Sequence, residues 1–323
     1  MAELHGKALT FDFGGTKLAG AIVDKANGEI RHFVRRQTPR SLGSQGSLDV
    51  IYALGDEILK KNNGNEVQAI GISFGGPITR DGQKIIKSQH IEGWEYFPLP
   101  EVLSEHFGLP VFMENDANAA ALGEWYFGAG EQCDSLFYVQ VSTGIGAGIV
   151  IDGKIYRGMG LAGEFGHLTI EDDGLQCACG KLGCLESYSS GWGIASRARG
   201  LYAGLKDDSA LRQLTGGKPE NVTTELVFEA YRQSDQDMRE LVHSAMASLA
   251  RCIADTVCIL DPERVVIGGG VARSRDIMEA EIMPYLEKYI PKFIRPHFDL
   301  RFSVLDGNET LCGAALLSEE RFR

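Results

Sequence analysis

The stretch KALTFDFGGTKLAGAIVD, residues 7–24, decides the fold of this chain. It predicts an apolar strand, a turn that contains two adjacent glycines, and a second apolar strand. Glycines at a strand end permit positive φ angles and let the backbone approach a ligand closely. Three further strands end in the same way, at ISFGGP (72–77), VSTGIGAG (141–148) and VVIGGG (265–270). Together these ends predict an α/β protein with a cleft lined by backbone amides, which suits phosphate.

The glycine turns do not match the two commonest nucleotide motifs. The sequence has no G-x-x-x-x-G-K-[ST] loop. TGIGAGIV and GGGVAR both lack the third glycine of a dinucleotide-binding fingerprint, so a dinucleotide enzyme is disfavoured. The motif D-x-G-G-T instead pairs Asp12, which could hold magnesium or its water, with Gly14, Gly15 and Thr16, which could face phosphates. Any one of these loops could also be an ordinary tight turn.

The remaining chain continues as alternating strands and helices. Its 323 residues are enough for two domains of ordinary size. Apolar patterns predict a strand at 28–38, a helix at 47–62, a strand running into a helix at 109–128, two strands and a hairpin at 135–158, a mainly helical segment at 190–261, a helix at 276–290, a strand at 300–305 and a closing helix at 309–323.

Charge and cysteine usage bound the function. The net charge is −12 and the sequence pI is about 5.1, which disfavours binding to nucleic acid or to an anionic membrane. The first residues lack the apolar core of a signal peptide, and no apolar run reaches the roughly 18 residues of a membrane span. We therefore expect a cytoplasmic enzyme with reduced thiols.

One histidine and three cysteines lie close together in HLTIEDDGLQCACGKLGCLE, residues 167–186. Nine residues separate His167 from Cys177, one separates Cys177 from Cys179, and four separate Cys179 from Cys184. This set supplies the four nitrogen and sulfur ligands of a closed, structural zinc site. The alternative is a group of buried or redox-labile thiols. The other cysteines lie in apolar surroundings and are expected in the core: Cys133, Cys252, Cys258 and Cys312.

The motifs resemble those of the ROK family of repressors, open reading frames and kinases. DFGGTK, ENDANAAALGE, STGIGAGIVIDGKIYRGMGLAGEFGH, CACGKLGCLE and VVIGGGVA follow the order of that family from about residue 8 to 315. The resemblance implies an α/β, actin-like ATPase (ribonuclease H-like) fold with two α/β domains around a cleft. It also implies a homodimer. We expect a smaller domain at 1–115 with about 305–323, and a larger one at 116–304 that carries the zinc loop.

Asp116 is the candidate general base. It lies at a strand-to-helix junction in ENDAN, where the helix dipole favours the ionised carboxylate. The plain alternative is that Asp116 only caps the helix. In the family the matching aspartate is the catalytic base, and the resemblance assigns Asn115 to the sugar. Asn118 could equally make a bond within the helix turn.

The resemblance also implies the other site residues. His167 would bind zinc through one ring nitrogen and reach a sugar hydroxyl with the other, while Glu186 could instead be an acid at a helix N-terminus. The sugar-binding set is Gly75, Gly76, His90, Asn115, Asp116, Glu164, His167 and Glu186. The nucleotide-binding set is Asp12, Gly14, Gly15, Thr16, Lys17, Thr143, Gly144, Gly146, Gly269 and Gly270.

These assignments imply ATP- and Mg²⁺-dependent phosphorylation of a hexose, with glucose to glucose 6-phosphate as the first expectation. His90 stands where many kinases of the family have asparagine, which leaves an N-acetylhexosamine kinase or a fructokinase as alternatives. A sugar-responsive repressor is less expected. Only about seven residues precede the first strand, which leaves no room for a helix-turn-helix domain.

Overall fold

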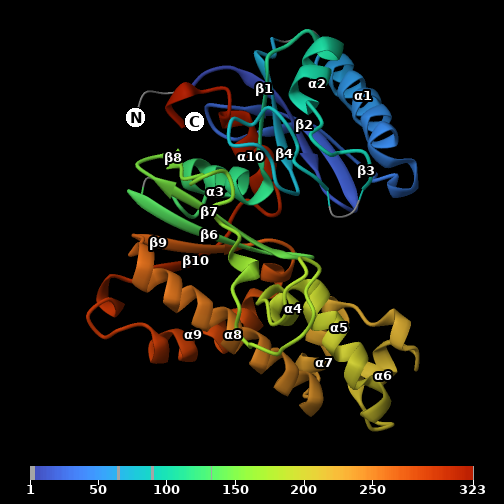
Figure 1. The fold of residues 1–323 in the computed structure, drawn as a ribbon, viewed down its shortest axis with the longest axis vertical. Helices are drawn as coiled ribbons and strands as arrows, with labels where there is room; N and C mark the ends of the chain where they lie inside the picture. The colour runs from blue at the N-terminus through green and yellow to red at the C-terminus, as the bar shows by residue number, and fades with distance from the viewer. Residues whose placement is uncertain (1–3, 64–65, 89–90, 132, 323) are drawn as a thin grey trace. The chain divides into compact units, whose positions relative to one another are not determined.

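The computed structural model describes residues 4–63, 66–88, 91–131 and 133–322 (Figure 1). The described residues form two five-stranded sheets with helices packed against them, so the predicted α/β class is confirmed. The chain divides into two compact units. Unit 1 contains residues 1–138, 148–163 and 303–323, and unit 2 contains residues 139–147 and 164–302. The domain boundaries expected from the sequence, after residue 115 and near residue 305, stay a prediction.

The sheet of unit 1 has the strand formed by residues 7–13 at its centre. Its strand order is β3-β2-β1-β4-β5. β1 pairs antiparallel with β2 and parallel with β4, while β3 pairs antiparallel with β2 and β5 parallel with β4. The strands are β1 (Lys7–Phe13), β2 (Lys17–Asp24), β3 (Ile30–Gln37), β4 (Ala69–Phe74) and β5 (Val111–Asn115).

The two faces of this sheet have different covers. Leu9, Phe11 and Phe13 point toward the large apolar core, to which helices α1 (Gly43–Lys61) and α2 (Leu99–Phe107) contribute. On the other face Ala8 and its neighbours pack against α10 (Glu309–Leu316). Odd-numbered residues of β1 therefore face α1, and even-numbered ones face α10, as the two-residue period of a strand requires.

Small residues let α10 approach the rest of unit 1 closely. A Cβ on Gly313 would lie 1.6 Å from the Ala119 carbonyl oxygen of α3 (Asp116–Phe127). A Cβ on Gly71 of β4 would lie 1.9 Å from the Ala314 carbonyl oxygen. Glycine is therefore required at these two contacts, because real Cβ atoms do not approach other atoms to such distances.

The second sheet has the order β10-β9-β6-β7-β8. Its strands are β6 (Ser135–Val141), β7 (Ile145–Ile151), β8 (Lys154–Ile155), β9 (Arg264–Gly268) and β10 (Leu300–Phe302). The segment that follows residue 190 is mainly helical, as predicted. Its helices are α5 (Gly191–Leu201), α6 (Ala210–Leu214), α7 (Thr224–Arg232) and α8 (Gln236–Leu260), and α9 (Arg275–Tyr289) lies after β9.

Side-chain caps fix where these helices begin. Ser190 caps α5, Thr223 caps α7 and Asp235 caps α8, each by accepting a hydrogen bond from a backbone N–H of the first turn. Each cap satisfies an N–H that has no partner within the helix. The caps explain why this helical segment divides into several helices.

Helix α8 has the length and apolar content of a membrane span. Half of its most apolar window is buried inside the structure, however, and the helix also carries Arg239, Glu240, Arg251 and Asp255. Its buried residues recur with helical period, from Met238 to Val257. These features are typical of the core helix of a globular domain.

Three expectations from the sequence were wrong in detail. The closing helix α10 ends at Leu316, and strand β10 covers only Leu300–Phe302. Cys258 is exposed, because it lies on the outward side of α8 beside the exposed Ile259, whereas the neighbouring Val257 is buried. The apolar sequence around Cys258 hides this difference, since burial on a helix changes with each residue.

The contact between α10 and α3 gives a first prediction. Gly313→Ala should destabilise the protein by about 1–3 kcal/mol, because the added methyl group overlaps a backbone carbonyl. Gly200→Ala in α5 is the control, since a Cβ there meets no atom within 4 Å. The control should be neutral or stabilising by about 0.5–1 kcal/mol. Urea unfolding curves measure both, and equal stability of the two variants would contradict the packing described here.

Candidate functional site

The turn between β1 and β2 is held by short hydrogen bonds. The Gly14 amide donates to the Lys17 carbonyl at 3.0 Å, and the Thr38 hydroxyl donates to the Gly14 carbonyl at 2.9 Å. Thr16 and Lys17 are exposed at the rim of the turn. The predicted phosphate residues of this turn therefore stand together on a fixed loop, with their amides next to a half-buried carboxylate, Asp12.

Asp12 lies at the carboxyl end of β1 beside two other polar groups. The Ser73 hydroxyl donates to Asp12 Oδ1 at 3.0 Å. Burial of the carboxylate and the negative charge of Asp116 raise the pKa of Asp12 from 3.8 to about 7, and the Ser73 hydrogen bond offsets part of this rise. A carboxylate in such a place gains from a nearby cation, which fits the predicted contact with Mg²⁺ or its water. Ser73 was not singled out from the sequence.

The junction between β5 and α3 presents Asp116. The helix is capped by Asn115, whose Oδ1 accepts from the Ala117 amide at 3.0 Å and from the Asn118 amide at 3.3 Å. Asn115 also donates to the Gly76 carbonyl at 3.3 Å. Asp116 is the first residue of the helix, so the role of cap belongs to its neighbour.

Gly75 leaves space in front of Asp116. A Cβ on Gly75 would lie 3.6 Å from Asp116 Oδ2 and 3.2 Å from the Phe13 carbonyl oxygen. Without that Cβ, one carboxylate oxygen of Asp116 faces the strand end that carries Gly75, while the other accepts from the Ala117 amide at 3.0 Å. This geometry can present a base to a substrate hydroxyl.

A buried ion pair supports this junction. Glu114 is 2% exposed, and its carboxylate accepts from Arg157 Nε at 2.6 Å, from the Asn115 amide at 3.0 Å and from Asn118 Nδ2 at 3.0 Å. The residue Asn118 therefore makes a structural bond, which was one of its two expected roles. Neither Glu114 nor Arg157 was identified from the sequence, because they are far apart along the chain.

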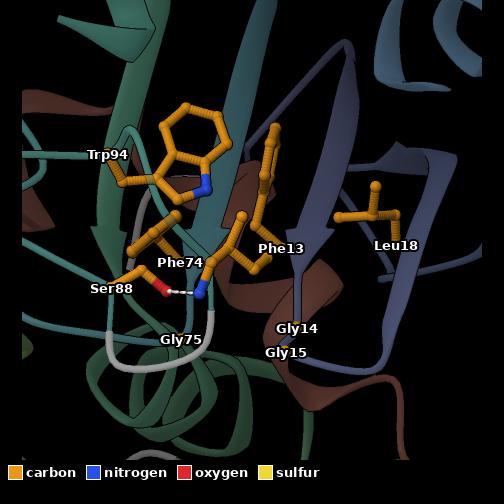
Figure 2. Close-up of a pocket in the computed structure, with 9 residues that line it drawn as sticks. Phe13, Gly14, Gly15, Leu18, Phe74, Gly75, Ser88 and Trp94 are labelled. Atoms are coloured by element: carbon orange, nitrogen blue, oxygen red, sulfur yellow. Dashed lines mark hydrogen bonds between the residues drawn. The ribbon is translucent and has the colours of Figure 1, made fainter. Parts of the chain in front are cut away.

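A small cavity lies beside the β1–β2 turn (Figure 2). Trp94 forms its wall and packs edge-to-face on Phe74, with ring centroids 5.9 Å apart. Ser88 Oγ accepts from the Ile91 amide at 3.2 Å (Figure 2). His90, predicted to contact the sugar, lies outside the described residues. The remaining lining residues are Phe13, Gly14, Gly15, Leu18 and Gly75.

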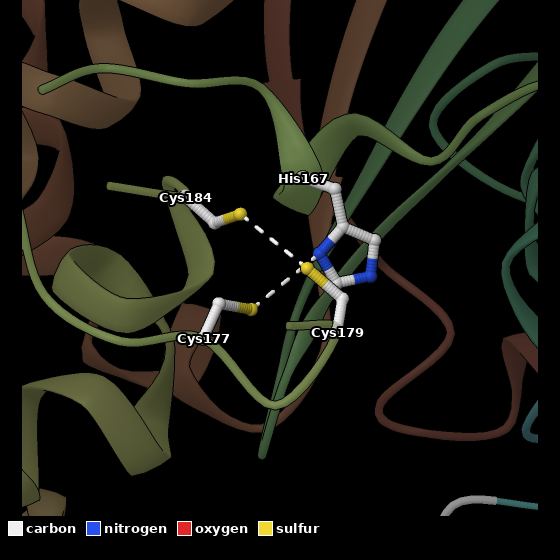
Figure 3. A group of neighbouring side chains, drawn as sticks. All are labelled: His167, Cys177, Cys179 and Cys184. Carbon is white, nitrogen blue, oxygen red and sulfur yellow. Dashed lines mark hydrogen bonds between the residues drawn. The ribbon is translucent and has the colours of Figure 1, made fainter. Parts of the chain in front are cut away.

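The histidine and cysteines predicted to bind zinc meet at one point of unit 2 (Figure 3). Their ligand atoms all lie within 4.8 Å of one another. Cys177 Sγ is 3.7 Å from His167 Nδ1, and Cys179 Sγ is 3.6 Å from Cys184 Sγ. A tetrahedron with zinc–sulfur bonds of about 2.3 Å has edges of about 3.8 Å, so both distances fit. The donor set fits a closed structural zinc site.

The ring of His167 faces two ways. Its Nδ1 points toward the sulfur atoms, while its Nε2 lies 3.6 Å from Glu164 Oε2. The Glu164 side chain is 52% exposed and can therefore accept a ligand hydroxyl. Zinc bound to Nδ1 would leave Nε2 protonated and able to donate. The structure thus places two of the residues predicted to bind the sugar, His167 and Glu164, side by side.

The loop that carries the cysteines is hydrogen-bonded through Glu186 to the turn at residues 142–145. Gly183 has a φ of +72°, and a Cβ there would lie 1.6 Å from the Glu171 carbonyl oxygen, so only glycine fits. Glu186 follows Cys184 closely, and its Oε2 accepts from the Ile145 amide at 2.9 Å. A Cβ on Gly144 would lie 2.4 Å from the same oxygen. Glu186 therefore links the cysteine loop to the turn at residues 142–145.

Two turns of unit 2 that carry glycines predicted to bind the nucleotide lie close to each other. A Cβ on Gly269 would lie 2.5 Å from the Val141 carbonyl oxygen, so the turn after β9 lies against the end of β6. The start of helix α5 lies against the turn at residues 142–145, where the Trp192 amide donates to the Thr143 carbonyl at 3.0 Å. Gly270 follows Gly269, whereas Gly146 lies within β7. Trp192 is half-exposed and was missed in the sequence.

Comparisons with known proteins agree with this architecture. A sequence model of the ROK family matches residues 8–321. A glucokinase from Thermotoga maritima is 34% identical over 98% of each chain, and an N-acetylmannosamine kinase from Escherichia coli is 35% identical over 96% of this chain and 98% of its own. The crystal structure of a ROK family glucokinase from Streptomyces griseus, in complex with glucose and AMPPNP, superposes with a TM-score of 0.83. That structure is 33% identical and covers 96% of this chain and 98% of its own. The expected actin-like ATPase fold is confirmed.

The geometry of the cysteine loop gives a prediction about metal content. Cys184→Ser should lose most of its zinc and lower the Tm, because one buried ligand of a closed site is removed. Cys258→Ser is the control, since Cys258 is exposed and outside the cluster. Elemental analysis of purified protein and thermal unfolding measure both effects. Full zinc content in the Cys184 variant would contradict the assignment.

The raised pKa of Asp12 gives a prediction about pH. Because the folded-state pKa of about 7 exceeds the ordinary 3.8, Asp12 favours folding below pH 4 and this contribution is lost as the pH rises through 7. Asp12→Asn should therefore match the wild type near about pH 4 and be more stable by about 1–3 kcal/mol near about pH 8.5, without Mg²⁺ or nucleotide.

Denaturant unfolding at the two pH values measures the Asp12 effect. Asp207→Asn, which removes an exposed carboxylate, is the control and should leave the pH dependence unchanged. Parallel stability curves for wild type and Asp12→Asn would show that Asp12 keeps an ordinary pKa.

Proposed function

This chain belongs to the ROK family, and from that premise we propose that it is an ATP-dependent hexose kinase whose acceptor is glucose. Similarity over nearly the whole chain to glucokinases of 32–34% identity supports the reaction. The structural observation that carries the proposal is the junction at residues 114–116. There a buried ion pair and the Asn115 cap hold Asp116, whose carboxylate faces the space left by Gly75.

Asp116 is the general base in this proposal. Its carboxylate accepts the proton of the sugar hydroxyl while that oxygen forms a bond to the γ-phosphorus of ATP. The bond from the γ-phosphorus to the bridging oxygen breaks, and ADP leaves with the electron pair. The proton on Asp116 then passes to solvent.

The residues of unit 1 that bind phosphate would act by position and charge. The amides of Gly15 and Thr16 can donate to phosphate oxygens, while the Gly14 amide holds the turn by donating to the Lys17 carbonyl. Asp12, oriented by the Ser73 hydroxyl, would hold Mg²⁺ or its bound water, which supplies neutralising charge for the ATP phosphates. The remaining predicted nucleotide residues, Thr143, Gly144, Gly146, Gly269 and Gly270, belong to unit 2.

Unit 2 would supply the groups that read the sugar. Zinc at the cysteine cluster would fix the ring of His167, so that its Nε2 and the Glu164 carboxylate present one donor and one acceptor to neighbouring hydroxyls. Glu186 accepts from the Ile145 amide with one oxygen, which orients the other. Such paired contacts discriminate between sugars strongly, because a missing hydroxyl leaves buried polar groups unpaired.

A second acceptor class is supported by a specific relative. The Escherichia coli N-acetylmannosamine kinase is 35% identical to this chain, over 96% of this chain. An N-acetylhexosamine, or fructose, would use the same base and the same phosphate turns. A non-catalytic sugar-responsive regulator would not need Asp116 on a supported junction. Cytoplasmic localisation and a homodimeric state stay predictions.

The kinase proposal is tested by Asp116→Asn. Loss of the base should lower kcat for glucose by about 10²–10⁴-fold, while glucose binding measured by calorimetry changes little. The exposed Asp207→Asn serves again as the matched control. ATP turnover is measured with glucose, N-acetylmannosamine, N-acetylglucosamine and fructose. Turnover limited to an N-acetylhexosamine would show that the acceptor is an N-acetylhexosamine and not glucose. An Asp116→Asn variant as active as the wild type would show that Asp116 is not the general base.

A further inference from the structure

Strand β3 carries three arginines whose surroundings differ. Arg31 Nη2 donates to Glu29 at 2.7 Å, and Arg36 Nη2 donates to Glu57 at 2.5 Å. Within the part of the chain that the structure describes, no carboxylate forms an ion pair with Arg35. Arg35 is therefore a cation of unit 1 whose charge is not matched by a neighbouring acid, in a chain of net charge −12.

The register of the sheet decides which way Arg35 points. Arg35 pairs with Ala19, and Ala19 pairs with Asp12. Directly paired residues project from the same face of a sheet, so Arg35 shares the face of Asp12. Arg36 pairs with Leu18 and projects from the other face, where its partner Glu57 belongs to α1.

The guanidinium of Arg35 is held so that its donors stay available. Its Cζ lies 5.1 Å from the centroid of the Phe33 ring, which is itself 42% exposed. Stacking on an aromatic ring engages the face of the guanidinium and leaves its in-plane N–H groups for an anion. That fork matches the geometry of a phosphate group.

The neighbouring phosphate turn lies on the same side. Lys17 pairs with Gln37 two residues along from the Arg35–Ala19 pair, and so projects from the same face. Arg40 Nε donates to the Gly15 carbonyl, which brings a third cation to the turn. The positive charge of Arg35 also holds down part of the rise in the pKa of Asp12. The ATP phosphates would otherwise approach a face on which Asp12 and Asp116 are both acidic.

We propose that Arg35 binds the terminal phosphate of the phosphoryl donor, stacked on Phe33 and acting with Lys17. This inference rests on the proposed function, in which a triphosphate binds at the β1–β2 turn. Arg35 forms and breaks no covalent bond. Its guanidinium neutralises negative charge on the phosphoryl group that is transferred. Arg35 also distinguishes a nucleoside triphosphate from a diphosphate, because ADP lacks the phosphate that Arg35 contacts.

The test compares Arg35→Gln with Arg36→Gln, which are adjacent, equal in charge and on opposite faces of β3. Calorimetry with Mg²⁺ measures the affinity of each variant for AMPPNP and for ADP. In Arg35→Gln the AMPPNP affinity should fall about tenfold, the order of one charge-assisted hydrogen bond, while the ADP affinity stays within about twofold. Arg36→Gln should bind both nucleotides like wild type, and Arg35→Lys should lie between.

Each outcome bears on the inference. A selective loss of AMPPNP affinity in Arg35→Gln, at an unchanged Tm, supports it. Equal AMPPNP affinities for Arg35→Gln and Arg36→Gln overturn it, and so does a loss that is as large for ADP. Sugar phosphorylation by the wild type is measured separately. Its absence would refute the proposed kinase function, while the ratio of the two nucleotide affinities still decides the role of Arg35.

Discussion

The hydrogen-bonded register of the sheet in unit 1 is the constraint on which the rest of the site depends. Pairing across the strands puts Arg35, Ala19, Asp12, Ser73 and Glu114 in one row. Each of these side chains therefore projects from the face that α10 and α3 also cover. A shift of one residue in any pair would turn its polar group into the apolar core beneath α1. The apolar residues between them, such as Phe11 and Phe13, resist that shift because they fill the core.

The candidate sugar contacts of unit 2 lie on loops and short helical turns, not on strands. A loop holds a side chain less firmly than a strand does, and a structural metal compensates by fixing several backbone positions at once. Four ligand atoms lie within 4.8 Å of one another, so one zinc ion would orient His167, while Glu186 anchors the same loop to the turn at residues 142–145. We infer that the cysteines position the neighbouring side chains, and that the carboxylates bind the sugar and accept its proton.

The sequence was most informative where the chemistry is local. Glycines mark strand ends, and the spacing of His167 and the cysteines is typical of ligands to a single metal ion, so both groupings could be predicted. The ion pair of Glu114 with Arg157, the hydrogen bond of Ser73 to Asp12 and the outward side of Arg35 depend on strand pairing, which no local pattern records. The cap at Asn115 was assigned one residue late as an alternative for Asp116, because helix starts are uncertain by a residue or two.

The most direct test of the account is the product balance of the complete reaction. Wild-type protein is incubated with Mg²⁺, ATP and glucose, ADP is quantified, and the sugar phosphate is identified by phosphorus and proton NMR. We predict equal amounts of ADP and glucose 6-phosphate, and no ADP above background when glucose is left out. ADP formed without sugar phosphate, or no ADP with any hexose or N-acetylhexosamine, would contradict the claim that this site transfers a phosphoryl group to a sugar.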